Sequence, residues 1–257
     1  MKIRLANPSD RPNVMKFCRD TFSWGDYIDE AWDHWIKDGN LFLIENDFPV
    51  GIAHANFSGN QVWIEGIRID PNYRRNHYAS TLIKKIETLA KEKGKLFSFM
   101  ITDEKNIPSI NMAKKCGFNS TQIWKFYTMI PKTCTDYSVN FVKKVPKHVT
   151  HYVKSWRWLP LDDSKITKLG KENRIITSEQ DNDISSAVLV DSSRFGKTLV
   201  VTFFSGDEFT TRNVLCYIQN FAFCNNYSRI EILSKENLTN FDSLELKNSF
   251  ILFEKLL

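Results

Sequence analysis

A basic turn between a strand-like and a helix-like segment is where the residue types first suggest chemistry. The apolar run 62–69 is followed by turn residues 70–72, and Arg74 and Arg75 then precede a segment of helical periodicity. The N–H groups in the first turn of a helix have no partners within the helix, and two guanidinium groups beside them could complete a pyrophosphate site. Taken alone, such a turn is more often a solvated connection, so a second signal is needed.

That second signal is a resemblance to a known family. Arg74, His77 and Ala79 stand where the GNAT superfamily of N-acetyltransferases has Arg or Gln-x-x-Gly-x-Gly/Ala, on the turn between its fourth strand and third helix. Downstream, Asn106-x-x-Ser109-x-x-Met112-Ala113-x-x-x-Gly117-Phe118 resembles the family's Asn-x-x-Ala/Ser through Gly-Phe ending. The two motifs have the family's order and separation, and the opening residues 3–6 with Asp10 are also similar. The resemblance covers residues 1–130.

The resemblance implies acetyl-CoA as co-substrate and no metal. In the family, backbone N–H groups after the fourth strand's centre hold the thioester carbonyl and the pantetheine, a contact assigned here to Ile67 and Ile69. Asn106, with Ser109 beside it, is assigned to the pantetheine arm. The full cofactor-binding set is Ile67, Arg68, Ile69, Arg74, Arg75, Asn76, His77, Tyr78, Ala79, Ser80, Asn106 and Ser109.

Glu65 is the candidate catalytic residue. An amine that is protonated near pH 7 must lose a proton before its nitrogen attacks a thioester, and a nearby carboxylate can take that proton. Glu65 lies within the apolar sequence Trp63-Ile64-Glu65-Gly66-Ile67, just before the strand segment that receives the acetyl group in the family. The alternative is that Glu65 points outward from a half-exposed strand.

Two positions depart from the family pattern. His77 stands where glycine is usual, so it either adopts the same backbone conformation at some cost or holds the loop away from the phosphates. Ala113 stands where many members have a tyrosine that acts as general acid for the thiolate. Tyr73, Tyr78 and Tyr127 are other tyrosines that could act as the general acid. A CoA thiolate can also leave without an acid.

For three further candidate sites, a structural role explains the residues better than a functional one. His148-x-x-His151 has a spacing that could bind metal on a helix, but a solvated linker fits better next to Pro146. Trp24, Trp32 and Trp35 could line an aromatic pocket, although their helical spacing favours core packing. Residues 193–198 form a basic loop without a following helix, which predicts a hairpin connection.

Composition sets broader limits. The 257 residues allow one large domain or two small ones, and a net charge of +5 is too small to argue for nucleic acid. The five cysteines are irregularly spaced and predict neither a disulfide framework nor a zinc site. Since no signal peptide or membrane span is evident, we expect a soluble cytoplasmic protein without a membrane partner.

Hydrophobic periodicity predicts the order β-α-α-β-β-β-α-β-α-β for the first 130 residues. The expected strands cover residues 2–5, 41–45, 50–57, 62–69, 96–101 and 122–130. Helices are expected after residues 7–10, around 29–35, from about 78 to Gly94, and at 109–115. In the second half we expect strands at 187–190, 198–204, 229–233 and about 250–256, with a helix at 210–225.

These patterns predict an α+β protein with a mixed, largely antiparallel sheet: a GNAT domain at 1–130, a linker at 131–150 and a degenerate GNAT-like domain at 151–257. The acidic sequence Ser205-Gly206-Asp207-Glu208 replaces a basic phosphate loop there. That domain is expected to cover the acceptor side or to mediate a dimer, in a monomer or homodimer.

The sequence Trp63-Ile64-Glu65-Gly66-Ile67-Arg68 is also similar to two-domain GNAT enzymes that acetylate the α-amine of free amino acids. We therefore expect a small primary amine or amino acid as acceptor. The alternatives are a protein lysine or N-terminal α-amine as acceptor, or a non-catalytic acyl-CoA-binding module.

Overall fold

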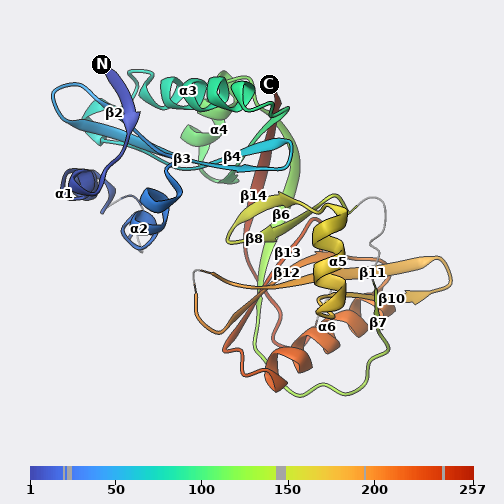
Figure 1. Cartoon of the computed structure of the whole chain (residues 1–257). Coiled ribbons are helices and arrows are strands. Elements are labelled where there is room, and N and C mark those ends of the chain that lie inside the picture. The colour runs from blue at the N-terminus through green and yellow to red at the C-terminus, as the bar shows by residue number, and fades with distance from the viewer. Residues whose placement is uncertain (20, 22–24, 143–148, 194, 239–240) are drawn as a thin grey trace. The chain divides into compact units, whose positions relative to one another are not determined.

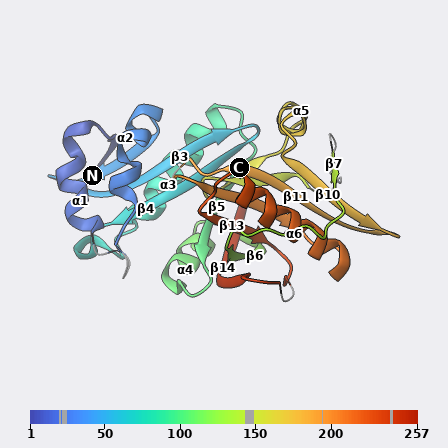
Figure 2. The ribbon, with the colours of Figure 1, turned by 90° about the horizontal axis from the view of Figure 1, so that it is seen from below.

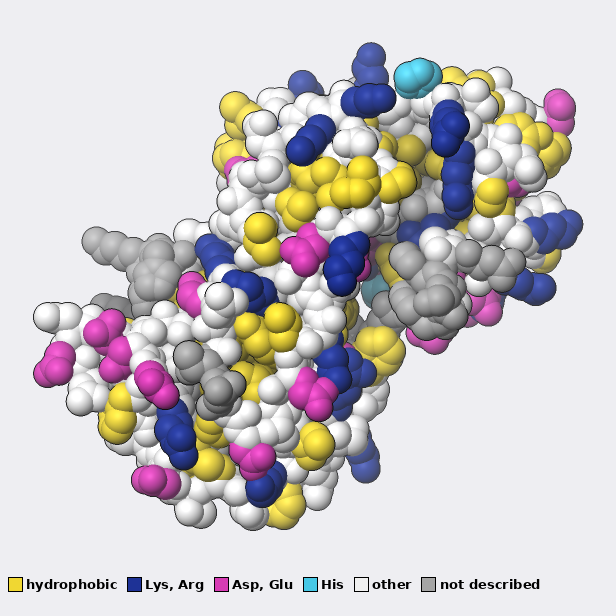
Figure 3. Space-filling view, turned by 180° about the vertical axis from the view of Figure 1, so that it is seen from behind, with side chains coloured by type: hydrophobic (Ala, Val, Ile, Leu, Met, Phe, Trp, Pro, Cys, Tyr) yellow, Lys and Arg dark blue, Asp and Glu magenta, His cyan; other side chains and the backbone are white. Residues whose placement is uncertain are grey.

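The computed structural model describes residues 1–19, 21, 25–142, 149–193, 195–238 and 241–257. The chain forms two compact units, Met1–Thr121 with Leu252–Leu257, and Gln122–Ile251. Within the described ranges, no helix is long and apolar enough to cross a membrane. On the face drawn in Figure 3, basic and acidic side chains are interspersed.

The first unit is built on a mixed sheet with the strand order β1-β2-β3-β4-β5-β14. Strands β1 to β4 pair antiparallel, and β4 pairs parallel with β5. Helices α1 and α2 lie on one face of this sheet and α3 lies on the other (Figure 1). The elements are β1 (Lys2–Leu5), the 3-10 turn η1 (Pro8–Asp10), α1 (Arg11–Cys18), α2 (Ile28–Asp38), β2 (Leu41–Glu45), β3 (Pro49–Ser58), β4 (Gln61–Ile69), the 3-10 turn η2 (Pro71–Tyr73), α3 (Tyr78–Glu92), β5 (Phe97–Asp103), α4 (Ile107–Lys115), and the first residues of β6 (Asn119–Met129).

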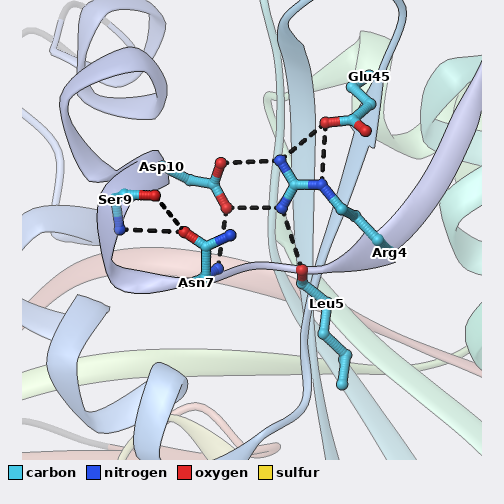
Figure 4. A network of polar contacts seen from close by, with 6 residues as sticks. All are labelled: Arg4, Leu5, Asn7, Ser9, Asp10 and Glu45. Carbon is cyan, nitrogen blue, oxygen red and sulfur yellow. Dashed lines mark hydrogen bonds and ion pairs between the residues drawn. The ribbon is translucent and has the colours of Figure 1, made fainter.

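A polar cluster joins β1, η1 and β2 in the first unit (Figure 4). The Arg4 guanidinium donates to both carboxylate oxygens of Asp10, at 2.7 and 2.8 Å, and to Glu45. Asn7 begins η1 with a capping box in which Asp10 accepts from the Asn7 N–H. Hydrogen bonding by Arg4 lowers the pKa of Asp10.

The last strand, β14 (Glu245–Leu256), returns to the first unit at its end and lies next to β5. The Leu257 N–H donates to the Leu96 carbonyl. Lys255 Nζ donates to Glu87 on α3 at 2.6 Å and to the Cys116 carbonyl after α4 at 2.8 Å. The expected C-terminal strand is present, but the sequence pattern did not indicate its partner.

In the second unit, the strand order is β6-β13-β12-β11-β10-β7. Helix α6 covers one face of this sheet (Figure 2), and the antiparallel hairpin of β8 and β9 lies on the other (Figure 1). Alternation along β12 explains this, since Leu199, Val201 and Phe203 join the α6 core while Thr202 accepts from the Val153 N–H of β8. The elements are β7 (Asn140–Phe141), β8 (His151–Lys154), β9 (Arg157–Pro160), α5 (Asp163–Lys171), β10 (Ile175–Gln180), β11 (Asp183–Asp191), β12 (Thr198–Phe204), α6 (Glu208–Cys224) and β13 (Arg229–Ser234).

The expectation that no cysteines form a disulfide is wrong in one case. Cys134 and Cys216 are bonded, with their Cα atoms 5.4 Å apart and a sequence separation of 82 positions. Such a pair shows no regular spacing because the fold of the second unit brings its members together. Cys18, Cys116 and Cys224 are free thiols.

Candidate active site

A β-bulge in β4 sets the direction of its polar side chains. Ile52 of β3 pairs with Arg68 and His54 pairs with Glu65, so Ala53 alone opposes two residues, Gly66 and Ile67. In a regular strand, residues three apart point to opposite faces. The extra residue brings Glu65 and Arg68 to the same face, toward the segment that contains α2.

Gly66 is required at this bulge for two reasons. Its φ is +62°, in the left-handed region that side chains disfavour. A Cβ at this position would lie 2.3 Å from Cη2 of Trp35. The Trp35 ring therefore packs directly against the backbone of β4.

Glu65 is held by a buried histidine. Its Oε1 lies 2.9 Å from Nδ1 of His54, and the Glu65 side chain is 13% exposed. The His54 ring is fully buried and stacks on Trp35, with ring centroids 4.6 Å apart and an interplanar angle of 3°. Nε2 of His54 lies 3.8 Å from Oδ2 of Asp38, the last residue of α2. The alternative, in which Glu65 points outward from a half-exposed strand, does not fit this geometry.

Arg68, one of the predicted cofactor residues, uses its side chain elsewhere. Its guanidinium donates to both oxygens of Asp26, at 2.6 and 3.0 Å, and lies over the Tyr27 ring. Burial by itself lowers the pKa of Arg68, but the Asp26 hydrogen bond and nearby groups outweigh this and leave it raised. The side chain therefore anchors the start of α2 to β4.

Strands β4 and β5 pair over a short stretch. Among the described residues their parallel pairs run from Gln61 with Phe97 to Trp63 with Phe99. Beyond this point, the Asp70 N–H donates to Val50 of β3. Because successive N–H groups of a strand alternate between its edges, the Ile69 N–H faces the β5 side. Ile67 lies within the bulge.

The turn before α3 contains two residues in the left-handed backbone region that glycine adopts most readily. Arg75 and His77 have φ of +64° and +61°. Of the two alternatives for His77, the structure shows the one in which histidine accepts the left-handed conformation. Arg74, Arg75, Asn76 and His77 are all exposed.

The N-terminus of α3 has no side-chain cap among the described residues. The N-cap residues of α1 and α2 likewise make no side-chain cap hydrogen bond, whereas Asn106 caps α4, Asp162 caps α5 and Asp207 caps α6. Ser80 and Thr81 both donate their hydroxyls to the His77 carbonyl. The first-turn N–H groups of α3, which include those of the predicted residues Tyr78, Ala79 and Ser80, thus lack the side-chain acceptor that α4, α5 and α6 have.

Other residues of the predicted set have local roles. Arg74 Nε donates to the Ile69 carbonyl and Asn76 donates to the Tyr73 carbonyl, both at 3.3 Å. Asn106 Oδ1 accepts from the Ser109 N–H at 3.2 Å. These contacts shape the loop and start α4, and binding of cofactor by these residues stays a prediction.

The tyrosines named as substitutes for Ala113 differ in their surroundings. Tyr78 accepts from Asn46 at 2.8 Å. Tyr73 packs edge-on against Phe48. Tyr127 lies in the core of the second unit, where burial raises its pKa and its hydroxyl accepts from the Leu238 N–H. The contacts of Tyr127 are structural.

The weaker candidates can be placed in part. Trp32 and Trp35 are buried in the core formed by α1, α2 and the sheet, as their spacing predicted, whereas Trp24 lies outside the described residues. His148 also lies outside them, while the half-buried His151 begins β8, so the interpretation as a solvated linker is wrong for His151. The described residues hold no cluster that could bind a metal. The loop 193–198, apart from Arg194, connects the antiparallel strands β11 and β12 as expected.

Sequence reasoning missed His54 and Asp38, and it missed a cavity of about 490 Å³ beside the end of β4. The only signal for His54 is a histidine within an apolar strand. The cavity does not include Glu65, and its wall mixes charged and aromatic side chains. It is lined by Asn13, Lys16, Phe17, Phe48, Pro49, Asp70, Pro71, Asn72 and Arg74.

Comparisons with known proteins identify a family for part of the chain and similar folds for the whole of it. The sequence model of the Acetyltransferase (GNAT) family matches residues 12–118, while no curated protein sequence matches the chain. The fold is similar to that of a candidate acetyltransferase from Thermoplasma acidophilum, at 14% identity over 100% of both chains, with a TM-score of 0.64. It is also similar to a GCN5-related N-acetyltransferase from Sphaerobacter thermophilus, at 9% identity over 99% of this chain and 95% of that one, with a TM-score of 0.62. Residues 12–118 therefore form an acetyltransferase domain of the GNAT family.

Proposed function

We propose that the protein transfers the acetyl group of acetyl-CoA to the primary amine of a small molecule, with free amino acids as the favoured acceptors. The observation that carries this proposal is the continuous segment in which the bulge of β4 holds Glu65, β4 separates from β5, and an uncapped helix follows. These features supply a base, a backbone edge and an anion site within one strand-loop-helix unit.

The described residues fit acetyl-CoA. The first-turn N–H groups of α3 and the exposed Arg74 and Arg75 form a site for the pyrophosphate. The left-handed conformations of Arg75 and His77 support this, because glycine usually supplies that conformation where a backbone approaches a ligand closely. Asn106 is assigned to the pantetheine arm and the Ile69 N–H to the cofactor along the β4 edge.

In the proposed reaction, Glu65 takes a proton from the acceptor ammonium, directly or through one water. The freed lone pair forms a bond to the thioester carbonyl carbon, and backbone N–H groups of β4 stabilise the oxyanion. The nitrogen of the tetrahedral intermediate loses its second proton to solvent, the carbon–sulfur bond breaks, and the CoA thiolate leaves with the bonding electrons. Its protonation by solvent suffices, because ordinary thiols have a pKa near ~8.5.

The preference for amino acids is supported by the likeness of residues 63–68 to amino acid acetyltransferases. A thiol-release assay with acetyl-CoA tests it against amino acids, simple amines, lysine peptides and peptides with a free N-terminus. We expect the highest kcat/KM among amino acids. Peptides alone as acceptors would indicate a protein acetyltransferase, and CoA binding without thiol release would indicate a non-catalytic module.

A further inference from the structure

His54 is a buried titratable residue that the proposed reaction does not use. It lies at the centre of β3, and its neighbours Ile52, Ala53 and Ala55 are also fully buried. An imidazole in such surroundings costs free energy unless its nitrogens have polar partners. An apolar residue would pack there without that requirement, so the contacts of His54 need an explanation.

The ring lies between two carboxylates. Glu65 from β4 is 2.9 Å from Nδ1, and Asp38 from α2 is 3.8 Å from Nε2. Asp38 also lies 3.5 Å from Nε2 of His34, whose side chain is 65% exposed. A row of side chains in contact therefore leads from the candidate base to the exposed surface of α2. Its members are Glu65, His54, Asp38 and His34.

The ring plane is fixed by its packing. Trp35 stacks on one side of the ring at 4.6 Å, and Gly66 gives Trp35 the space to lie against β4. His54 and Glu65 are directly opposite each other across the strand pair. Neither side chain can therefore move far without disturbing α2 or the bulge.

We propose that His54 is a positioning residue that donates its Nδ1–H to Glu65 and holds the carboxylate ready, in its ionised form, to take the acceptor's proton. This inference rests on the proposed role of Glu65 as the base. The hydrogen bond fixes one orientation of the carboxylate, and Asp38 stabilises the charged form of the ring from the other side.

The hydrogen bond between His54 and Glu65 should also affect the pH dependence of turnover. A hydrogen bond to a carboxylate favours its ionised form, so the proposal predicts that removing the His54 donor moves the acid limb of turnover to higher pH. The titratable groups that face the ring are Glu65 on β4 and Asp38 on α2, with His34 beyond Asp38. The residue opposite His54 on β2 is the apolar Leu41.

Two substitutions separate positioning from packing. His54→Phe keeps an aromatic ring on Trp35 but removes the donor. His54→Asn loses the ring but places an amide donor near the position of Nδ1. We expect kcat of H54F to fall roughly 10- to 100-fold with an unchanged KM for acetyl-CoA, and the acid limb of its kcat/KM profile to move up by about one pH unit. H54N should retain an acid limb close to that of the wild type and lose less in kcat.

A folded H54F with wild-type kcat and pH profile would overturn the inference, as would an H54N that is more impaired than H54F, because packing would then be the role of His54. If neither variant folds, D38N decides: an acid limb shifted to higher pH supports the inference, and an unchanged limb rejects it. Failure of the proposed function would give results that differ from these. The wild type would release no thiol from acetyl-CoA, or Glu65→Gln would leave turnover unchanged.

Discussion

Both the backbone bulge of β4 and the contact with His54 determine where the Glu65 side chain lies. Without the bulge at Gly66 and Ile67, Glu65 and Arg68 would point to opposite faces of β4. With the bulge, both face the segment 26–38, where Arg68 pairs with Asp26 and Glu65 meets His54. A single residue inserted into the strand thus puts an anchor and a candidate base side by side.

Replacing Glu65 by glutamine should slow turnover by ~10² to 10⁴, the usual contribution of a positioned base. The amide keeps the shape but cannot accept the proton, so acetyl-CoA affinity by calorimetry should stay nearly constant. The residual rate should recover as pH rises, because solvent then deprotonates the amine. Wild-type turnover across the pH range would assign the proton to another group.

His77→Gly should make the protein more stable by up to about 1 kcal/mol, because histidine at φ +61° is strained and glycine is not. Acetyl-CoA affinity should be equal or tighter. Asn173→Gly is a matched control, since asparagine at φ +54° tolerates the left-handed conformation better and should gain less. Much weaker binding by H77G would show instead that the imidazole contacts the cofactor.

At the scale of elements, the N-terminus of α3 is the main candidate anion site. Arg74→Glu with Arg75→Glu should weaken acetyl-CoA binding by on the order of 100-fold, because two attractive charges become repulsive next to a phosphate. Lys84→Glu with Lys85→Glu makes the same change in net charge on the exposed face of α3. That control should weaken binding less than about 3-fold in 0.15 M salt. Equal losses in the two variants would point to a general charge effect and against this site.

The Arg4 cluster predicts a pH-dependent contribution to stability. The pKa of Asp10 is lowered in the folded state, so its stabilising effect is present above the unfolded value of ~4 and lost as pH falls through the folded value. Arg4→Met should therefore cost ~1–3 kcal/mol in urea unfolding at pH 7 and less near pH 3. Lys132→Met, which breaks the exposed pair with Asp242 in the second unit, should cost under about 1 kcal/mol. A pH-independent cost at Arg4 would mean that packing dominates.

Local patterns predicted the elements of the first unit well, because its strands and helices have clear periods and turn residues. They missed β7 to β9, α5 and β10, which are short or lie among prolines and polar residues. The turn between β8 and β9 has Ser155 and Trp156 at positive φ, where sequence rules expect Asn or Gly. Glu65 could be named from its own strand, but His54 could not be named as its partner, since that pairing depends on the register around the bulge.

At the scale of the whole molecule, the second unit repeats one feature of the first. Strands β12 and β13 pair parallel and are joined by α6, as β4 and β5 are joined by α3. The helix starts differ, because Asp207 caps α6 by accepting from the Thr210 N–H at 2.9 Å. Ser185 accepts from the Gly206 N–H and contacts the hydroxyls of Thr210 and Thr211. The place that corresponds to the proposed anion site of the first unit is filled here by the protein's own carboxylate and hydroxyls.

We therefore expect each chain to bind one acetyl-CoA. Calorimetric titration should give a stoichiometry near one, and the double substitution of Arg74 and Arg75 should remove that binding without uncovering a second site. Asp207 repels phosphate by its charge and also occupies an N–H group of the first turn of α6. Asp207→Asn removes the charge but still caps the helix, so the stoichiometry should stay at one. Two equivalent sites in the wild type, or a full-affinity site that survives the double substitution, would show that the second unit also binds the cofactor.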